Sequence, residues 1–168
     1  SKGFGFNHHS EFDTLNALLN AGFNFGPPAQ APQNRRDVEA FLMCFDTDTH
    51  AGVGQQVTFD GTNNTNATLV NRLNSFVTLA NSGVVAMIAK GRVAGIDRGY
   101  VYTGANVMQS DISTETTSPT ALRTGASAGN EITFTLVPTG TQLRQGIDRD
   151  SDGYFDRDEI DNCGDPAN

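Results

Sequence analysis

The chain has 168 residues, enough for one ordinary domain or for one domain with a small appended unit. Its formal net charge is −8, and it carries no stripe of basic residues that could neutralise phosphates, which makes nucleic acid a poor candidate partner. No run of about 18 apolar residues is present, so we expect no membrane span.

Apolar residues recur at helical spacing in the first half of the chain. Three helices are predicted there, over residues 11–20, 34–45 and 67–81. One short strand is predicted over residues 56–59. Ser10 is the expected cap of the first helix, and Gly22 its stop. The second helix carries an apolar stripe that we expect to be buried: Val38, Phe41, Leu42 and Phe45.

After Gly83 the apolar period changes to that of strands. Five strands are predicted, over residues 84–90, 99–103, 107–112, 131–137 and 141–147. Short turns between them favour an antiparallel meander. The Ser/Thr-rich stretch 113–129 is predicted to be a loop with one helical turn at 119–123. A last short helix is expected over 157–162.

Helices followed by strands indicate an α+β fold with an antiparallel β meander and a C-terminal EF-hand-like calcium loop. We predict a helical segment over residues 1–50, an α+β domain over 51–147 and a calcium-binding tail over 148–168.

The calcium prediction rests on residues 148–159, which read DRDSDGYFDRDE. Ca²⁺ takes about 6–8 oxygen ligands, and a tight loop can aim every second side chain at one point. Six residues are predicted to hold the ion: Asp148, Asp150, Asp152, Tyr154, Asp156 and Glu159. Tyr154 would act through its backbone carbonyl, and Asp156 would act directly or through a water. Gly153 stands where such a loop turns sharply.

Charge is concentrated in the same tail. Residues 148–168 hold eight acids and two arginines, whereas the other 147 residues hold eleven acids and nine bases. Binding Ca²⁺ would relieve the repulsion among these acids, so the tail should be ordered only with metal present. The alternative is an acidic tail that merely interacts with solvent.

Several features are typical of an exported protein. The chain begins Ser1-Lys2-Gly3 with no hydrophobic run behind it, which we interpret as a processed or internal part of a longer precursor. Cys44 and Cys163 have no metal-ligand spacing, and we expect a disulfide between them, the alternative being two buried thiols. Two Asn-x-Thr sequons, at Asn63 and Asn66, agree with a secreted, extracellular or periplasmic location.

Two N-terminal segments resemble the end of the second haem domain of dihaem cytochrome c peroxidases. They read FNHHSEFDTL, from Phe6, and RDVEAFL, from Arg36. Later phrases, including GIDRD from Gly146, resemble the C-terminal region of large secreted bacterial proteins, and the end of the chain is similar to thrombospondin type 3 calcium repeats. The resemblance makes His8 a candidate haem ligand. However, no Cys-x-x-Cys-His is present, so c-type haem cannot attach covalently to this chain.

No catalytic constellation emerges, so we do not expect an enzyme. The leading interpretation is a secreted, calcium-stabilised structural or interaction domain that docks to the remainder of its precursor or to copies of itself. The alternative is the C-terminal part of a peroxidase-like c-type cytochrome whose haem is attached outside this chain. A carbohydrate-binding module ranks last, because zero Trp and three Tyr leave few side chains on which a sugar could stack.

Overall fold

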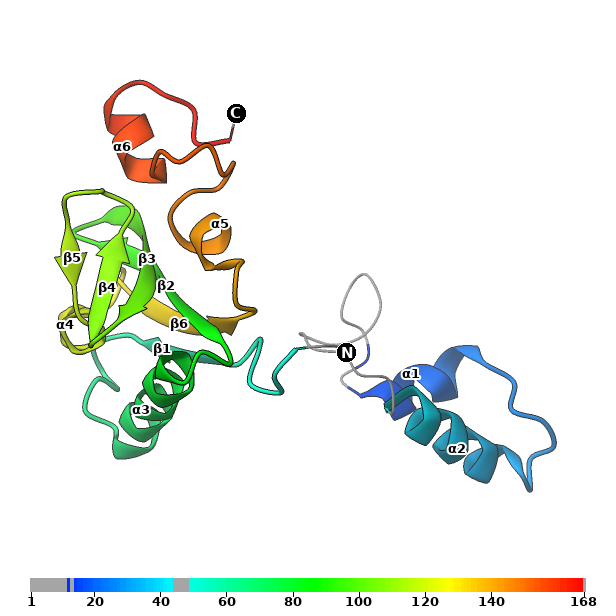
Figure 1. Cartoon of the computed structure of the whole chain (residues 1–168). Helices are drawn as coiled ribbons and strands as arrows, with labels where there is room; N and C mark the ends of the chain where they lie inside the picture. Colours follow the sequence, from blue (N-terminus) through cyan, green and yellow to red (C-terminus); the bar gives the residue numbers. More distant parts are fainter. Residues whose placement is uncertain (1–11, 13, 44–48, 168) are drawn as a thin grey trace. The chain divides into compact units, whose positions relative to one another are not determined.

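The computed structural model describes residues 12, 14–43 and 49–167 (Figure 1). The chain forms two compact units, Ser1–Ala51 and Gly52–Asn168. The acidic tail belongs to the second unit.

The described part of the first unit contains two helices, α1 (Leu15–Gly22) and α2 (Ala31–Met43). The Thr14 hydroxyl accepts a hydrogen bond from the Ala17 N–H, so Thr14 caps α1, and the predicted cap Ser10 lies outside the described residues. The two helices are linked by a hydrogen bond of 2.9 Å from the Asn16 amide to the Glu39 carboxylate.

The predicted buried stripe of α2 is wrong at Phe41 and Leu42, whereas Val38 is half-buried. Phe41 is 62% exposed and Leu42 is 40% exposed, while Phe45 lies outside the described residues. Helical spacing identifies a face, but a face is buried only where another element packs on it. α1 is eight residues long and is too short to cover all of the longer α2.

The second unit is built on a six-stranded antiparallel sheet of order β1-β6-β2-β3-β4-β5. Its strands are β1 (Gln56–Phe59), β2 (Ala86–Val93), β3 (Ile96–Gly104), β4 (Val107–Ser110), β5 (Thr116–Thr117) and β6 (Ile132–Val137). Its helices are α3 (Ala67–Asn81), α4 (Pro119–Gly125), α5 (Gln142–Gly146) and α6 (Asp156–Asp161). The α+β class and the antiparallel sheet are therefore confirmed.

The sheet departs from a simple meander at one edge. Strands β2 to β5 follow one another, but β6 returns to pair with β2, and β1 then pairs with β6. The β2–β3 hairpin is also longer than predicted, because Ala94 and Gly95 both have positive φ (53° and 78°) and form a tight turn that suits strand twist.

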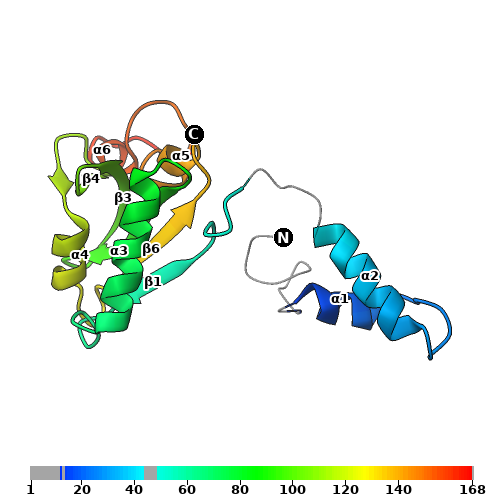
Figure 2. The ribbon, with the colours of Figure 1, turned by 60° about the horizontal axis from the view of Figure 1, so that its bottom comes forward.

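The two faces of the sheet carry different layers (Figures 1 and 2). α3 and α4 cover one face, where Phe76 and Leu122 join a core that includes Phe59, Phe134 and Tyr100. On the other face a smaller cluster contains Ile88, Val101, Val137 and Ile147, with Phe155 packed against it. Ile147 and Phe155 come from the C-terminal segment, so this cluster fixes the tail on the sheet.

The strand predicted over 141–147 is wrong, because Gln142–Gly146 is the helix α5. The residues Gln142 to Arg144 favour a helix over a strand. Ile147, just after α5, is fully buried and anchors the segment, so the segment does not need the alternating buried positions of a strand.

Candidate metal centre

Two glycines allow the C-terminal segment to lie directly on the sheet. A Cβ built on Gly99 of β3 would lie 1.9 Å from the carbonyl oxygen of Gly146, and one built on Gly146 would lie 2.4 Å from Cγ2 of Val101. Neither residue has positive φ, so glycine is required at each position because there is no room for a Cβ, and not because of the backbone conformation. The end of α5 therefore contacts the backbone of β3, and this contact places the acidic loop that follows.

Gly146→Ala is expected to lower the free energy of unfolding by about 1–3 kcal/mol, because the added methyl group overpacks against Val101. Gly125→Ala is the matched control, since a Cβ on Gly125 meets nothing within 4 Å. Thermal unfolding of both variants checks this, and equal melting temperatures would contradict the close packing.

The acidic loop turns around the side chain of Asp148, which is 6% exposed. Its two carboxylate oxygens accept hydrogen bonds from the Ser151 N–H (2.7 Å) and the Gly153 N–H (3.3 Å). Gly153 has φ +96°, a conformation that only glycine adopts readily. The glycine therefore stands at the sharp turn where the sequence predicts it.

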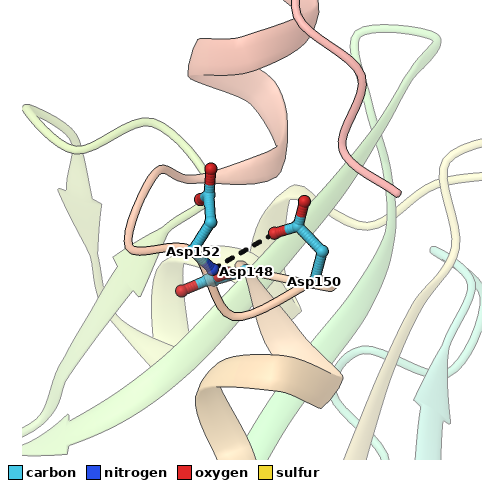
Figure 3. A group of neighbouring side chains, drawn as sticks. All are labelled: Asp148, Asp150 and Asp152. Atoms are coloured by element: carbon cyan, nitrogen blue, oxygen red, sulfur yellow. Dashed lines mark hydrogen bonds between the residues drawn. The ribbon is translucent and has the colours of Figure 1, made fainter. Parts of the chain in front are cut away.

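Three aspartates converge inside this turn (Figure 3). Asp148, Asp150 and Asp152 each offer a carboxylate oxygen, and these three oxygens all lie within 4.8 Å of one another. The Asp150 carboxylate also accepts the Asp152 N–H at 3.3 Å, and that of Asp152 accepts the Tyr154 N–H at 2.8 Å. These backbone donors orient the carboxylates.

Two carboxylate oxygens at the loop are buried without a hydrogen-bond partner in the described part of the chain: Asp150 Oδ2 and Glu159 Oε2. A buried anionic oxygen without a donor is costly, and a bound cation is one way of satisfying it. The pKa of Glu159 is raised, first by desolvation and then by the charges of Asp150, Asp152, Asp156 and Asp148. Glu159 thus lies in the field of the other four acids.

The remaining predicted ligands are not part of this group of three carboxylates. Asp156 and Glu159 are not within the 4.8 Å group formed by the three aspartates. Asp156 begins α6, and its Oδ1 accepts the Arg149 N–H at 2.8 Å, so it bridges the two ends of the loop. Tyr154, predicted to offer its carbonyl, has a side chain that is 69% exposed.

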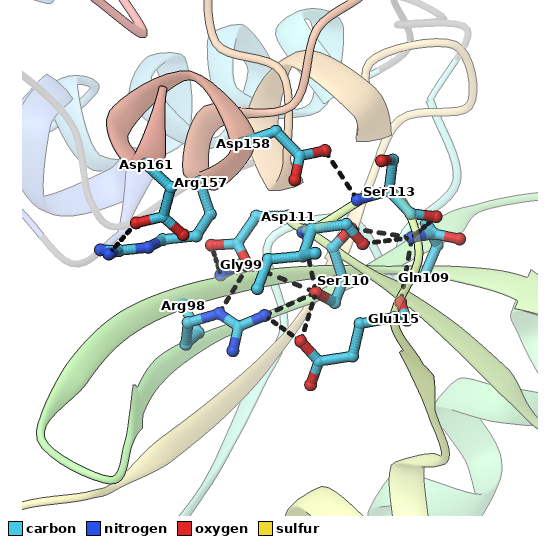
Figure 4. A network of polar contacts seen from close by, with 11 residues as sticks. Arg98, Gly99, Gln109, Ser110, Asp111, Ser113, Glu115, Arg157, Asp158 and Asp161 are labelled. Atoms are coloured by element: carbon cyan, nitrogen blue, oxygen red, sulfur yellow. Dashed lines mark hydrogen bonds and ion pairs between the residues drawn. The ribbon is translucent and has the colours of Figure 1, made fainter. Parts of the chain in front are cut away.

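A polar network that the sequence does not reveal joins the tail to the sheet (Figure 4). Arg98 is 10% exposed and contacts Asp111 and Glu115, each at 2.7 Å. The Asp111 carbonyl accepts the Arg157 N–H at 3.1 Å. The Asp158 carboxylate accepts the Ser113 N–H at 2.8 Å. The loop between β4 and β5 therefore holds α6 through two of its own backbone groups, the Asp111 carbonyl and the Ser113 N–H.

The charge of Arg98 and those of Asp111 and Glu115 stabilise one another. Burial by itself lowers the pKa of Arg98, but its bonds to Glu115 and Asp111 outweigh burial and raise it. Asp111, 4% exposed overall, also accepts the Gly99 N–H at 2.9 Å. The pairing of residues 98 and 111 depends on the β3–β4 register, and no sequence motif identifies it.

Other residues singled out in the sequence lie apart from this site. Asn66 caps α3 by accepting the Thr68 and Leu69 N–H groups, and the Asn63 amide donates to the Thr58 carbonyl. Both sequon side chains therefore take part in local structure. His8 lies outside the described residues, so the haem alternative is carried by the sequence resemblance alone. A Soret band in the absorption spectrum of the purified protein would favour that alternative.

The disulfide also stays a prediction. Cys163 is exposed, and Cys44 lies outside the described residues. If the two are bonded, thiol labelling of unreduced, denatured protein should find no reactive cysteine. Two labelled thiols would contradict the pairing.

No family model, curated protein or solved structure matches this chain. Among the described residues, no helix is long and apolar enough to cross a membrane.

Proposed function

We propose that the chain is a secreted, calcium-stabilised structural or interaction domain whose loop 148–159 binds one Ca²⁺ ion in an EF-hand-like manner. The convergence of the Asp148, Asp150 and Asp152 carboxylates carries this proposal, together with buried oxygens that have no partner among the described residues. A set of carboxylate and carbonyl oxygens suits a hard cation, and a flexible site with many oxygens suits Ca²⁺ better than Mg²⁺.

The ion would act structurally. Asp148 follows the buried Ile147, and Asp156 donates its N–H to the Ile147 carbonyl at 2.8 Å, so the loop starts and ends at one anchored point. Drawing in Glu159 would pull α6 toward that point. With five acidic side chains and a carbonyl directed at one ion, little room would remain for a substrate.

The proposal also includes what the domain docks to. We infer that the domain docks to the remainder of its precursor or to copies of itself. The exposed Phe41 and Leu42 of the first unit are apolar groups that such docking would cover.

Calorimetric titration with Ca²⁺ tests the site. One ion should bind per chain, and Asp152→Ala should weaken binding by about tenfold or more, because it removes an anionic ligand. Asp161→Ala is the matched control. Like Asp152→Ala, it removes one negative charge. However, Asp161 lies in α6 outside the loop, so its loss should leave the calcium affinity nearly unchanged. Equal loss in both variants would mean that general acidity attracts the ion, and no uptake by the parent would end the proposal.

A further inference from the structure

A cleft of about 500 Å³ opens between the β2–β3 hairpin and the C-terminal segment, next to the candidate metal loop. This volume is in the range of small-ligand sites. Gly99 and Gly146, which contact each other, line it, and so does Asp156 of the loop. The cleft is therefore formed by the sheet on one side and by the proposed calcium-binding tail on the other.

Basic side chains are concentrated in this cleft. The chain has eleven Lys and Arg residues and a net charge of −8. Five of those bases line the cleft: Lys90, Arg92, Arg98, Arg149 and Arg157. Two of them, Arg98 and Arg157, are drawn in Figure 4. Four acids line the cleft as well, Asp97, Asp111, Glu131 and Asp156, so the bases exceed the acids by one.

Three of the five bases already have acidic partners. Arg92 pairs with Asp97 and Arg98 with Asp111, each at 2.7 Å, and Arg157 pairs with Asp161. The side chains of Lys90 and Arg149 have no hydrogen-bond or ion-pair partner in the part of the chain that the structure describes. Lys90 comes from β2 and Arg149 from the loop, so one unpaired cation stands on each side of the cleft.

We propose that the cleft binds a carboxylate group presented by an acidic peptide, held between Lys90 and Arg149. A guanidinium and an ammonium are the protein groups that recognise carboxylates. The lining also contains Asp97, Asp111 and Glu131, which disfavour a doubly charged phosphate more than a singly charged carboxylate. None of the described residues that line the cleft is aromatic, so they offer a sugar ring nothing to stack on, and a peptide fits better than an acidic glycan.

Carboxylate binding should depend on calcium, a step that rests on the proposed function. Asp156 faces both the loop and the cleft, and it accepts the Arg149 N–H at 2.8 Å. A calcium ion bound to Asp156 would offset one negative charge in the cleft lining and add positive charge beside Arg149. Calcium would therefore favour the carboxylate electrostatically and would also hold Arg149 in place.

NMR titration of the full chain with the capped peptide acetyl-Glu-Glu-amide in excess calcium tests this. We expect saturable shifts of the backbone amide signals of Gly91, Gly99 and Arg149, and no such shifts with acetyl-Gln-Gln-amide. The double variant Lys90→Gln/Arg149→Gln should bind the peptide about tenfold or more weakly. Arg72→Gln/Arg144→Gln, which removes the same charge from two residues that do not line the cleft, should bind it like the parent.

The outcomes separate the two proposals. If calcium binds but the Glu and Gln peptides behave alike, the cleft inference is overturned and the calcium site stands. If the Glu peptide binds equally with calcium and with a chelator, the coupling is overturned. If acetate competes fully at equal concentration, the site recognises a free carboxylate, and the peptide assignment is overturned.

Discussion

Removing calcium with a chelator is expected to lower the free energy of unfolding by about 3–4 kcal/mol relative to protein at a free calcium concentration about 100–1,000 times the dissociation constant. We expect this stabilisation because the folded loop gathers three carboxylates at one point, whereas the unfolded chain does not. Without the ion, the eight acids of residues 148–168 repel one another with only two arginines to compensate.

The Asp152→Ala variant supplies the control for this result. Because the variant should bind calcium about tenfold or more weakly, chelation should lower its free energy of unfolding by at least about 1.4 kcal/mol less than it does in the parent. A parent protein that melts at the same temperature with calcium and with chelator would contradict a stabilising role for the ion. A similar shift in parent and variant would assign the effect to calcium bound elsewhere.

Arg98→Met is expected to lower the free energy of unfolding by about 3–5 kcal/mol, because it leaves Asp111 as an uncompensated buried charge. Asp111 also holds the Arg157 N–H through its carbonyl, so the damage should reach the tail. Chemical denaturation of both proteins measures the change.

Two variants show whether the cause is the buried charge. Arg92→Met breaks the Arg92–Asp97 pair, which has the same 2.7 Å distance but side chains 56% and 80% exposed, so it should cost less than about 1 kcal/mol. Adding Asp111→Asn to Arg98→Met removes the stranded charge and keeps an acceptor for the Gly99 N–H, and it should recover part of the loss. Equal effects of Arg92→Met and Arg98→Met would contradict the network's role.

The elements that depend on a few neighbouring residues can be predicted from the sequence. The third helix and the first strand have the predicted bounds, Ala67–Asn81 and Gln56–Phe59. Asn66 caps that helix through its own side chain, and Gly83 follows it with φ +75°. The turn at Gly153 and the grouping of Asp148, Asp150 and Asp152 also follow from spacing, because they depend on a few consecutive residues.

Features that depend on distant contacts could not be predicted in this way. The prediction of a strand over 141–147 fails because nothing in the spacing of these residues reveals that Gly99 leaves room for the end of α5. The Arg98–Asp111 pair needs the β3–β4 register, and the basic cleft needs the tail to return to β2 and β3. Helical spacing also predicted burial of Phe41 without showing what would cover it.

Hydrogen exchange of the backbone amides, with calcium and with chelator, tests the central claim most directly, because it locates the effect of the ion along the chain. We predict that chelation removes protection from residues 141–167, above all from amides bonded across the loop such as those of Ser151 and Asp156, while the sheet amides of β2 and β6 keep theirs. Equal protection of the tail in both conditions would contradict the account and would leave residues 148–168 as an acidic tail that needs no metal.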